Sequence, residues 1–216
     1  MGRTIWVFAV ALGVTLSACR TMVPAMPSSS ADAPLPEATG GWRATATDAD
    51  KQRIRGWYSS WQAALADARA KGFGAEIDRE GALLQPMAAL PNPHLPAGEY
   101  RCRTIKVGAQ GRGVLGYIAY GWFRCRVAPE QGLSSLTKLS GSQRPVGLIF
   151  PDNLKRQVFL GTLELGDEKM AINYGSDRMR DMAGLVERIG DNRWRVVLPA
   201  PAYESLLDVI ELVPAG

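Results

Sequence analysis

Residues 100–127 read YRCRTIKVGAQGRGVLGYIAYGWFRCRV and carry the phrase Arg-Cys-Arg twice, centred on Cys102 and on Cys125. Each copy lies in a run that is typical of a β-strand, and the Gly-rich segment 108–116 separates the two runs. If these strands pair antiparallel around that turn, Cys102 lies opposite Cys125. A disulfide would then pin the first hairpin of a larger sheet.

The strand pattern continues to the C-terminus. From residue 99 onward, apolar and polar residues alternate with a period of two. The expected strands cover residues 99–107, 116–127, 133–139, 145–150, 157–165, 183–189, 193–198 and 206–213. Short turns separate most of them, and Gly190-Asp191-Asn192 is a strong hairpin signal. The fold class expected is mainly β, of the α+β type, with residues 99–216 forming an antiparallel up-and-down β-barrel of about eight strands. A β-sandwich is the alternative.

Residues 42–98 are predicted to form a helical segment and a connector in front of the barrel. Thr47, with an acidic residue three positions later, is a helix-capping pattern. One apolar face then recurs at three- and four-residue spacing up to a helix end at Gly72. It consists of Ile54, Trp57, Tyr58, Trp61 and Leu65. A short second helix is expected at residues 75–79, and four prolines make residues 85–98 an extended connector.

Residues 1–18 have the features of a signal peptide. Arg3 supplies a positive charge, and residues 5–16 form an apolar run that is too short for an ordinary membrane span. The run ends in Leu16-Ser17-Ala18-Cys19, which resembles the lipobox of bacterial lipoproteins, where the cysteine receives a diacylglyceryl group. The alternative is an ordinary signal peptide that happens to precede a cysteine.

The lipobox resemblance implies that Cys19 is the first mature residue and carries the lipid anchor. Arg20, a non-acidic residue, implies the outer membrane, with the domain on its periplasmic face; a soluble periplasmic protein is the alternative. Residues 19–41 are rich in Pro, Ser and Ala, so they are expected to form a lipidated N-terminus and a flexible linker.

The composition limits the classes of function. The chain has 216 residues, a formal net charge of +4, 46% hydrophobic and 21% charged residues, which suits one globular domain with extra segments. It has no basic block or nucleic-acid-binding motif, so no nucleic-acid partner is expected. One of the three cysteines is assigned to the lipid, and the pair Cys102 and Cys125 is expected to be bonded in an oxidising periplasm, with a stabilisation of roughly 3 kcal/mol. Two buried free thiols are the alternative.

Several phrases occur in a characteristic order. They are Tyr100-Arg101-Cys102-Arg103, Gly141-Ser142-Gln143-Arg144-Pro145, Val186-Glu187-Arg188-Ile189-Gly190 with Arg193-Trp194-Arg195, and Glu204-Ser205 with Asp208-Val209-Ile210-Glu211-Leu212. Over about residues 42–213 they resemble an uncharacterised family of bacterial envelope proteins, domain of unknown function 4893. The resemblance implies no activity. The barrel half is also similar in architecture to lipocalin-type (calycin) barrels, some of which are periplasmic protease inhibitors, although a fold does not give a function.

Catalytic groups are sparse. His94 is the single histidine, and it is expected at the surface of a proline-flanked loop. Ser135 and Lys138 match the Ser-x-x-Lys pattern of penicillin-interacting enzymes, but they lie on an expected strand and the companion motifs are absent.

Carboxylates and metal ligands give no stronger signal. Glu204, Asp208 and Glu211 alternate with Leu and Val, so they are expected on the solvent face of a strand rather than in a glycosidase site. One histidine and a bonded cysteine pair leave few ligands for zinc. The sequence therefore predicts no enzyme, no metal site and no cofactor.

The expected disulfide register gathers four arginines on the face opposite the disulfide. Arg101 would lie opposite Arg126 and Arg103 opposite Arg124, with Trp122 on the same face. Like charges in directly opposed positions are destabilising, so something must compensate for them. We refer to these five residues as the arginine cluster.

Two interpretations of the arginine cluster remain open. In the first, nearby acids neutralise the arginines, with Glu99, Glu76 and Asp78 as candidates, and the helix face of Trp57 and Trp61 covers the aromatic residues. In the second, the cluster binds a ligand, because arginines bind phosphate or carboxylate groups and aromatic rings stack on sugars.

Two further places are candidate ligand sites. The first is the charged loop 173–181 near an expected mouth of the barrel, with Tyr174, Asp177, Arg178, Arg180 and Asp181. The second is Arg144, which precedes a proline at the start of a strand. The expected function is a non-enzymatic binding, scaffold or inhibitor module for an envelope glycan, lipopolysaccharide or protein partner, attached to the membrane by its lipid. The alternative is a cell-wall or lipid hydrolase centred on Ser135 with Lys138, or on a carboxylate pair.

Overall fold

A computed structural model of the chain describes Met1, Gly2 and residues 40–216. Residues 3–18 of the predicted signal peptide, Cys19 with its predicted lipid anchor and nearly all of the predicted linker lie outside the described residues. No helix in the described part of the chain is long and apolar enough to cross a membrane.

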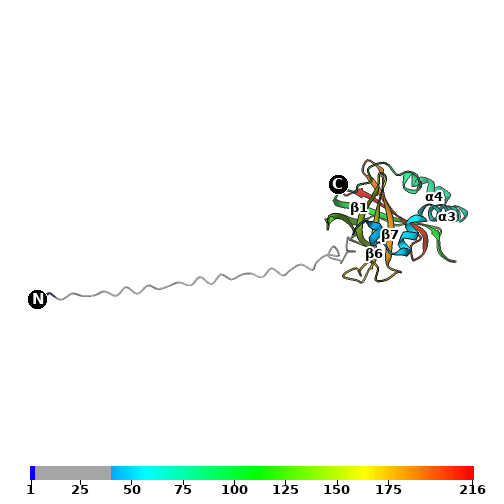
Figure 1. Cartoon of the computed structure of the whole chain (residues 1–216). Helices are drawn as coiled ribbons and strands as arrows, with labels where there is room; N and C mark the ends of the chain where they lie inside the picture. The colour runs from blue at the N-terminus through cyan, green and yellow to red at the C-terminus, as the bar shows by residue number, and fades with distance from the viewer. Residues whose placement is uncertain (3–39) are drawn as a thin grey trace.

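Antiparallel strands close into a barrel, with helices on its outside (Figure 1). The strands are β1 Gly98–Ala109, β2 Tyr117–Ala119, β3 Phe123–Glu130, β4 Leu133–Lys138, β5 Gln143–Asn153, β6 Arg156–Leu165, β7 Asp181–Gly190, β8 Arg193–Pro199 and β9 Ser205–Pro214. From β3 to β9 each strand pairs with the next, and β1 pairs with both β3 and β9. This closes an eight-stranded barrel, with β2 as an extra strand beside β1. The predicted barrel is confirmed, and the alternative sandwich is wrong.

One predicted strand is divided in two. The sequence predicted a continuous strand over residues 116–127, but β2 ends at Ala119 and β3 begins at Phe123. The two strands pair with different halves of β1, since β2 pairs with Ile105 to Val107 and β3 with Gly98 to Cys102. The short segment 120–122 between them belongs to neither strand and lies at one end of the barrel.

Alternate strand residues form two apolar cores. The core inside the barrel consists of Leu95, Tyr100, Cys102, Cys125, Val127, Leu136, Ile149, Phe159, Val186, Trp194, Val196, Leu198, Ile210 and Leu212. The strand residues of the outer core include Ile105, Val107, Leu148, Phe150, Val158, Leu160, Leu185, Val197, Leu207 and Val209. The helices cover this outer core, which is why these strands are apolar on both faces.

Helical elements cover one side of the barrel, where Figure 1 shows α3 and α4 together. They are α1 Trp42–Thr45, α2 Asp48–Arg55, α3 Trp57–Ala70, α4 Gly74–Arg79 and the 3₁₀ helix η2 Gly81–Leu84. The Thr47 hydroxyl accepts a hydrogen bond from the Asp50 amide at 3.2 Å, which confirms the predicted helix start. The predicted single helix is interrupted at Gly56, which ends α2 and begins α3.

The apolar face of α3 packs on the barrel. Trp61, Ala64 and Ala68 are fully buried, at the spacing of one helix face. Tyr58, which was expected on this face, lies beside the buried stripe and is exposed. The small side chains at 64 and 68 let the helix axis approach β1 closely.

The proline-rich connector closes one end of the barrel. Leu95 is buried inside with Tyr100 and Trp194. The Trp194 indole N–H donates to the His94 carbonyl at 3.0 Å, and the Tyr100 hydroxyl donates to the Pro96 carbonyl at 2.7 Å. The connector therefore acts as a plug, while the His94 side chain itself is exposed, as predicted.

Cys102 and Cys125 form the predicted disulfide, with their Cα atoms 5.9 Å apart. The predicted register is wrong by two residues, because Cys125 lies opposite Tyr100 and Cys102 lies opposite Phe123. The bond therefore joins diagonal neighbours, at a Cα separation that disulfides allow. A shift of two residues keeps every side chain on the same face, so the alternation of the sequence could not reveal it.

Candidate ligand-binding site

The barrel is hollow at the end opposite the connector. A cavity of about 270 Å³ lies there, bounded by the loops that follow β2, β4, β6 and β8. Inward-facing residues of six strands form its apolar wall: Phe123, Pro145, Leu163, Met182, Leu198 and Ile210. One half of the barrel is thus filled with side chains around the disulfide, and the other half contains the open cavity.

Lys106 of β1 provides a charged group on the inner wall. Its ammonium lies 2.9 Å from an Asp208 carboxylate oxygen and 3.3 Å from one of Glu204. The Ser205 hydroxyl donates a hydrogen bond to the other Asp208 oxygen. Burial disfavours the charged amine, but the two carboxylates outweigh it and raise the pKa of Lys106. Lys106 is therefore charged, and carboxylates of the protein already neutralise its charge.

Lys138 of β4 is a second buried lysine in the same cavity, and its surroundings are different. Its ammonium donates to the Gln143 carbonyl at 2.8 Å and lies 4.0 Å from the centre of the Phe123 ring. Within residues 40–216, no carboxylate lies within ion-pair distance of it. Burial, together with the positive charges of Lys106 and Arg144, lowers the pKa of Lys138 to about 8.

Stability should rise with pH above about 8 because of Lys138. In the unfolded chain a lysine keeps its proton up to about pH 10.4, whereas the folded chain releases it near pH 8. Between these values the unfolded state binds more protons, so the free energy of unfolding increases with pH. Lys138→Met should remove this dependence and should be about 1–2 kcal/mol more stable than the parent at pH 7, a value reduced for solvent screening in the open cavity.

Urea unfolding of both chains at pH 7 and at about pH 9.5 measures this effect. The stability difference between the variant and the parent should shrink as pH rises. A difference that stays constant over this range would show that Lys138 titrates like an ordinary lysine.

The cavity lies inside a region that is shared with other proteins. A family model described as Domain of unknown function (DUF4893) matches residues 42–212. The chain belongs to this family. The match begins with α1 and ends in β9, so it includes the helices, the connector plug and the whole cavity wall. No curated protein and no solved structure matches the chain, so the site of this DUF4893 domain is interpreted from its own residues.

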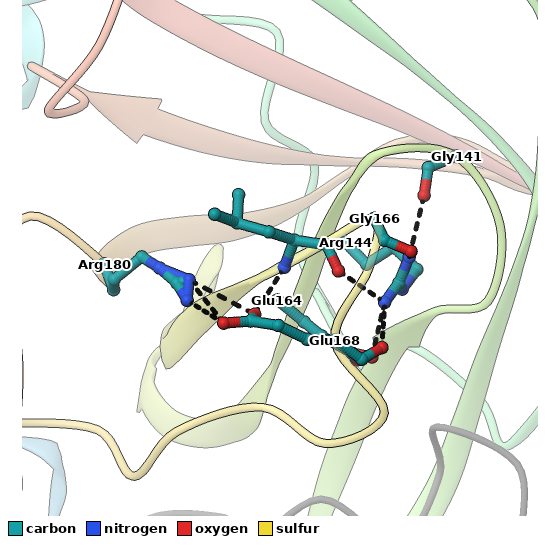
Figure 2. A network of polar contacts seen from close by, with 7 residues as sticks. Gly141, Arg144, Glu164, Gly166, Glu168 and Arg180 are labelled. Atoms are coloured by element: carbon teal, nitrogen blue, oxygen red, sulfur yellow. Dashed lines mark hydrogen bonds and ion pairs between the residues drawn. The ribbon is translucent and has the colours of Figure 1, made fainter.

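Arg144, predicted as a ligand residue, is a structural clamp in this DUF4893 domain (Figure 2). Its guanidinium binds a Glu164 oxygen at 2.5 Å and donates to backbone carbonyls of the following loop at 2.7 Å for Leu165 and 2.9 Å for Glu168. Figure 2 shows Arg144 and Arg180 on either side of Glu168, whose carboxylate pairs with Arg180. Since protein groups occupy these donors, Arg144 is not placed to bind a ligand.

The loop candidates also have mainly structural contacts. The Tyr174 hydroxyl donates to Asp50 at 2.6 Å and accepts from the Thr47 amide at 3.1 Å, which ties the loop to the start of α2. Asp177 accepts a hydrogen bond from the Met179 amide at 2.9 Å within its own turn. Arg178 is exposed. None of these three lines the cavity, whereas Arg180 and Asp181 of the same loop do.

The arginine cluster is divided by the observed register. Arg101, not Arg103, lies opposite Arg124. Arg103 lies opposite Glu211 of β9, and its guanidinium contacts Glu211 and Glu80, each at 2.5 Å. Arg103 therefore joins the barrel to the helical segment and is not available to a ligand.

Acids neutralise one more member of the cluster. Arg126 lies opposite Glu99 and pairs with it at 2.5 Å, which confirms the first of the candidate acids. The other two pair elsewhere, Glu76 with Arg79 and Asp78 with Arg69.

The outer surface keeps two arginines without an acid. Among the described residues, neither Arg101 nor Arg124 has a carboxylate within ion-pair distance. Trp122 is 45% exposed, so the predicted helix cover is wrong, and the Arg101 guanidinium lies 5.1 Å from its ring centre. This part of the cluster is on the outside of the barrel, apart from the cavity.

The Ser-x-x-Lys pair is not assembled. Lys138 shares the inner face of β4 with Leu136, whereas Ser135 lies on the outer face, where its hydroxyl donates to the Ala128 carbonyl at 3.2 Å. The hydrolase centred on these two residues therefore has no geometric basis.

Asp208 and Glu211 of β9 are buried, so the predicted solvent face is wrong for these two, whereas Glu204 is exposed as predicted. Asp208 faces the cavity, whereas Glu211 faces outward between Arg103 and Arg193, at 2.5 Å from each. Their side chains leave opposite faces of the strand, so they do not form a catalytic pair.

Lys106 was not among the predicted site residues, and Lys138 and Asp208 were named only in pairs that are not assembled, although a signal for the cavity was present. Lys106 has the same strand parity as Cys102, Lys138 the parity of Leu136, and Asp208 the parity of Ile210 and Leu212. A charged residue on the core face of a strand must have a partner or line a cavity. At Lys106, Lys138 and Asp208 this rule predicts a polar site inside the barrel.

Proposed function

We propose that this chain is a lipid-anchored envelope protein whose barrel binds a small amphipathic anion. The observation that carries the proposal is the buried Lys138 ammonium, which faces a cavity without an acidic partner among the described residues. A buried cation without a counter-ion lowers stability. A ligand carboxylate or phosphate would supply the missing partner, so the same amine that weakens the empty protein strengthens the complex.

The rest of the wall suits the other part of such a ligand. Leu163, Met182 and Ile210 offer an apolar surface to a short chain or ring. The volume of about 270 Å³ lies at the lower end of ligand pockets, which favours a small molecule over a long-chain lipid. Binding without turnover is proposed because the Ser-x-x-Lys and carboxylate pairs are not assembled.

Octanoate, a carboxylate with a short apolar chain, is a suitable probe. Titration calorimetry of the mature chain should show saturable binding, and Lys138→Met should weaken it about tenfold or more, since a charge-assisted hydrogen bond is lost. Lys155→Met is the matched control, because Lys155 is exposed at the closed end of the barrel. Equal affinity of both variants would contradict the assignment of Lys138.

The proposed anchor has a separate test. Cells given radioactive palmitate should label the parent chain, and Cys19→Ser should abolish the label and release the protein from the membrane fraction. Unchanged membrane retention of the variant would contradict lipidation at Cys19.

A further inference from the structure

We infer that the Lys138 amine captures an aliphatic aldehyde in the barrel cavity as a reversible Schiff base, an inference that rests on the proposed binding function. A Schiff base needs an amine that is accessible to a ligand, not fixed as a cation by an acid, and sheltered from bulk water. Only one of the two lysines in the cavity meets all three conditions.

The contacts of the two amines separate their roles. Asp208 and Glu204 hold Lys106 as a cation at 2.9 and 3.3 Å. Lys138 has one hydrogen bond, to a neutral carbonyl, and an aromatic ring beneath it. The neutral amine still has hydrogens to donate to that carbonyl, and no acid within residues 40–216 holds its proton, so Lys138 is the reactive group and Lys106 is a neighbouring cation.

Besides burial, the positive charges of Lys106 and Arg144 disfavour the protonated form of Lys138. The charged groups that line it or influence Lys138 are Lys106, Asp208, Glu204, Asp181, Arg180, Arg53 and Arg144. Lys106 pairs with Asp208 and Glu204. The three arginines pair with acids that do not line the cavity, Arg53 with Asp50, Arg180 with Glu168 and Arg144 with Glu164. With a pKa of about 8 for Lys138, roughly a tenth of it is neutral at pH 7, against well under a thousandth of an ordinary lysine.

The reaction is balanced without an oxidant, a reductant or a metal. The nitrogen lone pair forms a bond to the carbonyl carbon, and the C=O π electrons move to the oxygen, which takes up a proton. The resulting carbinolamine then loses its oxygen as water. Two protons of the amine leave in that water, and a C=N bond replaces the C=O bond. Hydrolysis reverses each step, so the product is a captured ligand and not a modified one.

The cavity also indicates the class of carbonyl compound. The chain of an aliphatic aldehyde would lie against Leu163, Met182 and Leu198 while the carbonyl carbon reaches Lys138. The Lys106 cation lines the same cavity, where a positive charge favours the negative charge that develops on the carbonyl oxygen.

Octanal with sodium cyanoborohydride tests this, since the reductant converts each Schiff base into a stable secondary amine. Intact mass and peptide mapping of the mature chain at pH 7 should show Lys138 labelled about tenfold or more faster than Lys155, and the rate should rise with a midpoint near pH 8. Lys138→Arg keeps the positive charge but has no amine that can form the adduct, so it should lose the fast label. Circular dichroism of this variant verifies that it folds.

The outcomes separate the two proposals. Octanoate binding together with octanal labelling of Lys138 no faster than that of Lys155 would overturn the Schiff base and leave the anion-binding function standing. Fast labelling that survives in Lys138→Arg would assign the reaction to another lysine and overturn the inference as well. If neither octanoate nor octanal associates with the cavity, both proposals fall.

Discussion

Replacing Arg195 with methionine is expected to lower the free energy of unfolding by about 3–5 kcal/mol, because it leaves buried partners uncompensated. Arg195 and Glu187 are both fully buried, and their side chains meet at 2.6 Å. The same guanidinium donates to the carbonyls of Ala82, Leu83 and Gln85 at 2.8, 2.9 and 2.8 Å, and lies 4.5 Å from the Trp61 ring centre. Arg195 therefore joins the barrel wall to η2 and to α3.

Methionine keeps most of the volume but none of the donors. The η2 carbonyls would remain buried without a partner, each at a cost of about 1–3 kcal/mol. Glu187 would keep only Arg156, at 2.5 Å. Arg126→Met is the matched control, since Arg126 pairs with Glu99 on the surface, and it should change stability by less than about 1 kcal/mol. Guanidinium chloride unfolding compares the two variants, and losses of equal size would refute the role given to Arg195.

The second large effect is expected at the glycine pair of the barrel wall. Gly147 of β5 and Gly161 of β6 lie directly opposite each other. A Cβ atom at Gly161 would lie 2.2 Å from the Val146 carbonyl oxygen and 2.7 Å from the Gly147 Cα. The Phe159 ring lies over the pair, 2.8 Å from the same position. The two strands approach closely here because neither has a side chain.

Gly161→Ala should therefore destabilise the chain by about 3 kcal/mol, since backbone atoms and not flexible side chains must move. Gly111→Ala is the control, because the corresponding Cβ would meet nothing within 4 Å; a change within about 0.5 kcal/mol is expected there. Thermal unfolding of both variants measures the difference. A stable Gly161→Ala chain would mean that the strands separate at this point without loss.

The fold was largely predictable, because local patterns specify it. Alternation of apolar residues, turn residues and the helix cap at Thr47 each depend on neighbours in the sequence, and these predictions agree with the structure. The split of residues 116–127 was not predictable, because it depends on which part of β1 each segment reaches. The break at Gly56 was not predicted either; it separates α2, which packs on β7, from α3, which packs on β1. The predicted register of the hairpin was wrong for a related reason. A disulfide can join two cysteines that lie directly opposite each other or two that are diagonal neighbours, and the sequence does not distinguish these arrangements.

The site was predicted less well than the fold. Arg144, Tyr174 and Asp177 carry suggestive chemistry, but the structure assigns them to clamps and turns. Lys106 of β1 and Lys138 of β4 line one cavity because the sheet curls. Asp208 of β9 reaches Lys106 because the barrel closes through the pairing of β1 with β9. The cavity residues come from separate strands, so no short sequence motif contains them together.

By itself the sequence determined the order of strands, the inner and outer faces, the cysteine pair and the region of the chain that closes into a barrel, because each of these follows from periodicity or from residue type. Only the tertiary structure decided which half of the barrel is filled, which arginines pair with acids, and that Lys138 has no acidic partner within residues 40–216. Those outcomes depend on distances between residues that are remote in sequence, and a linear pattern contains no such distances.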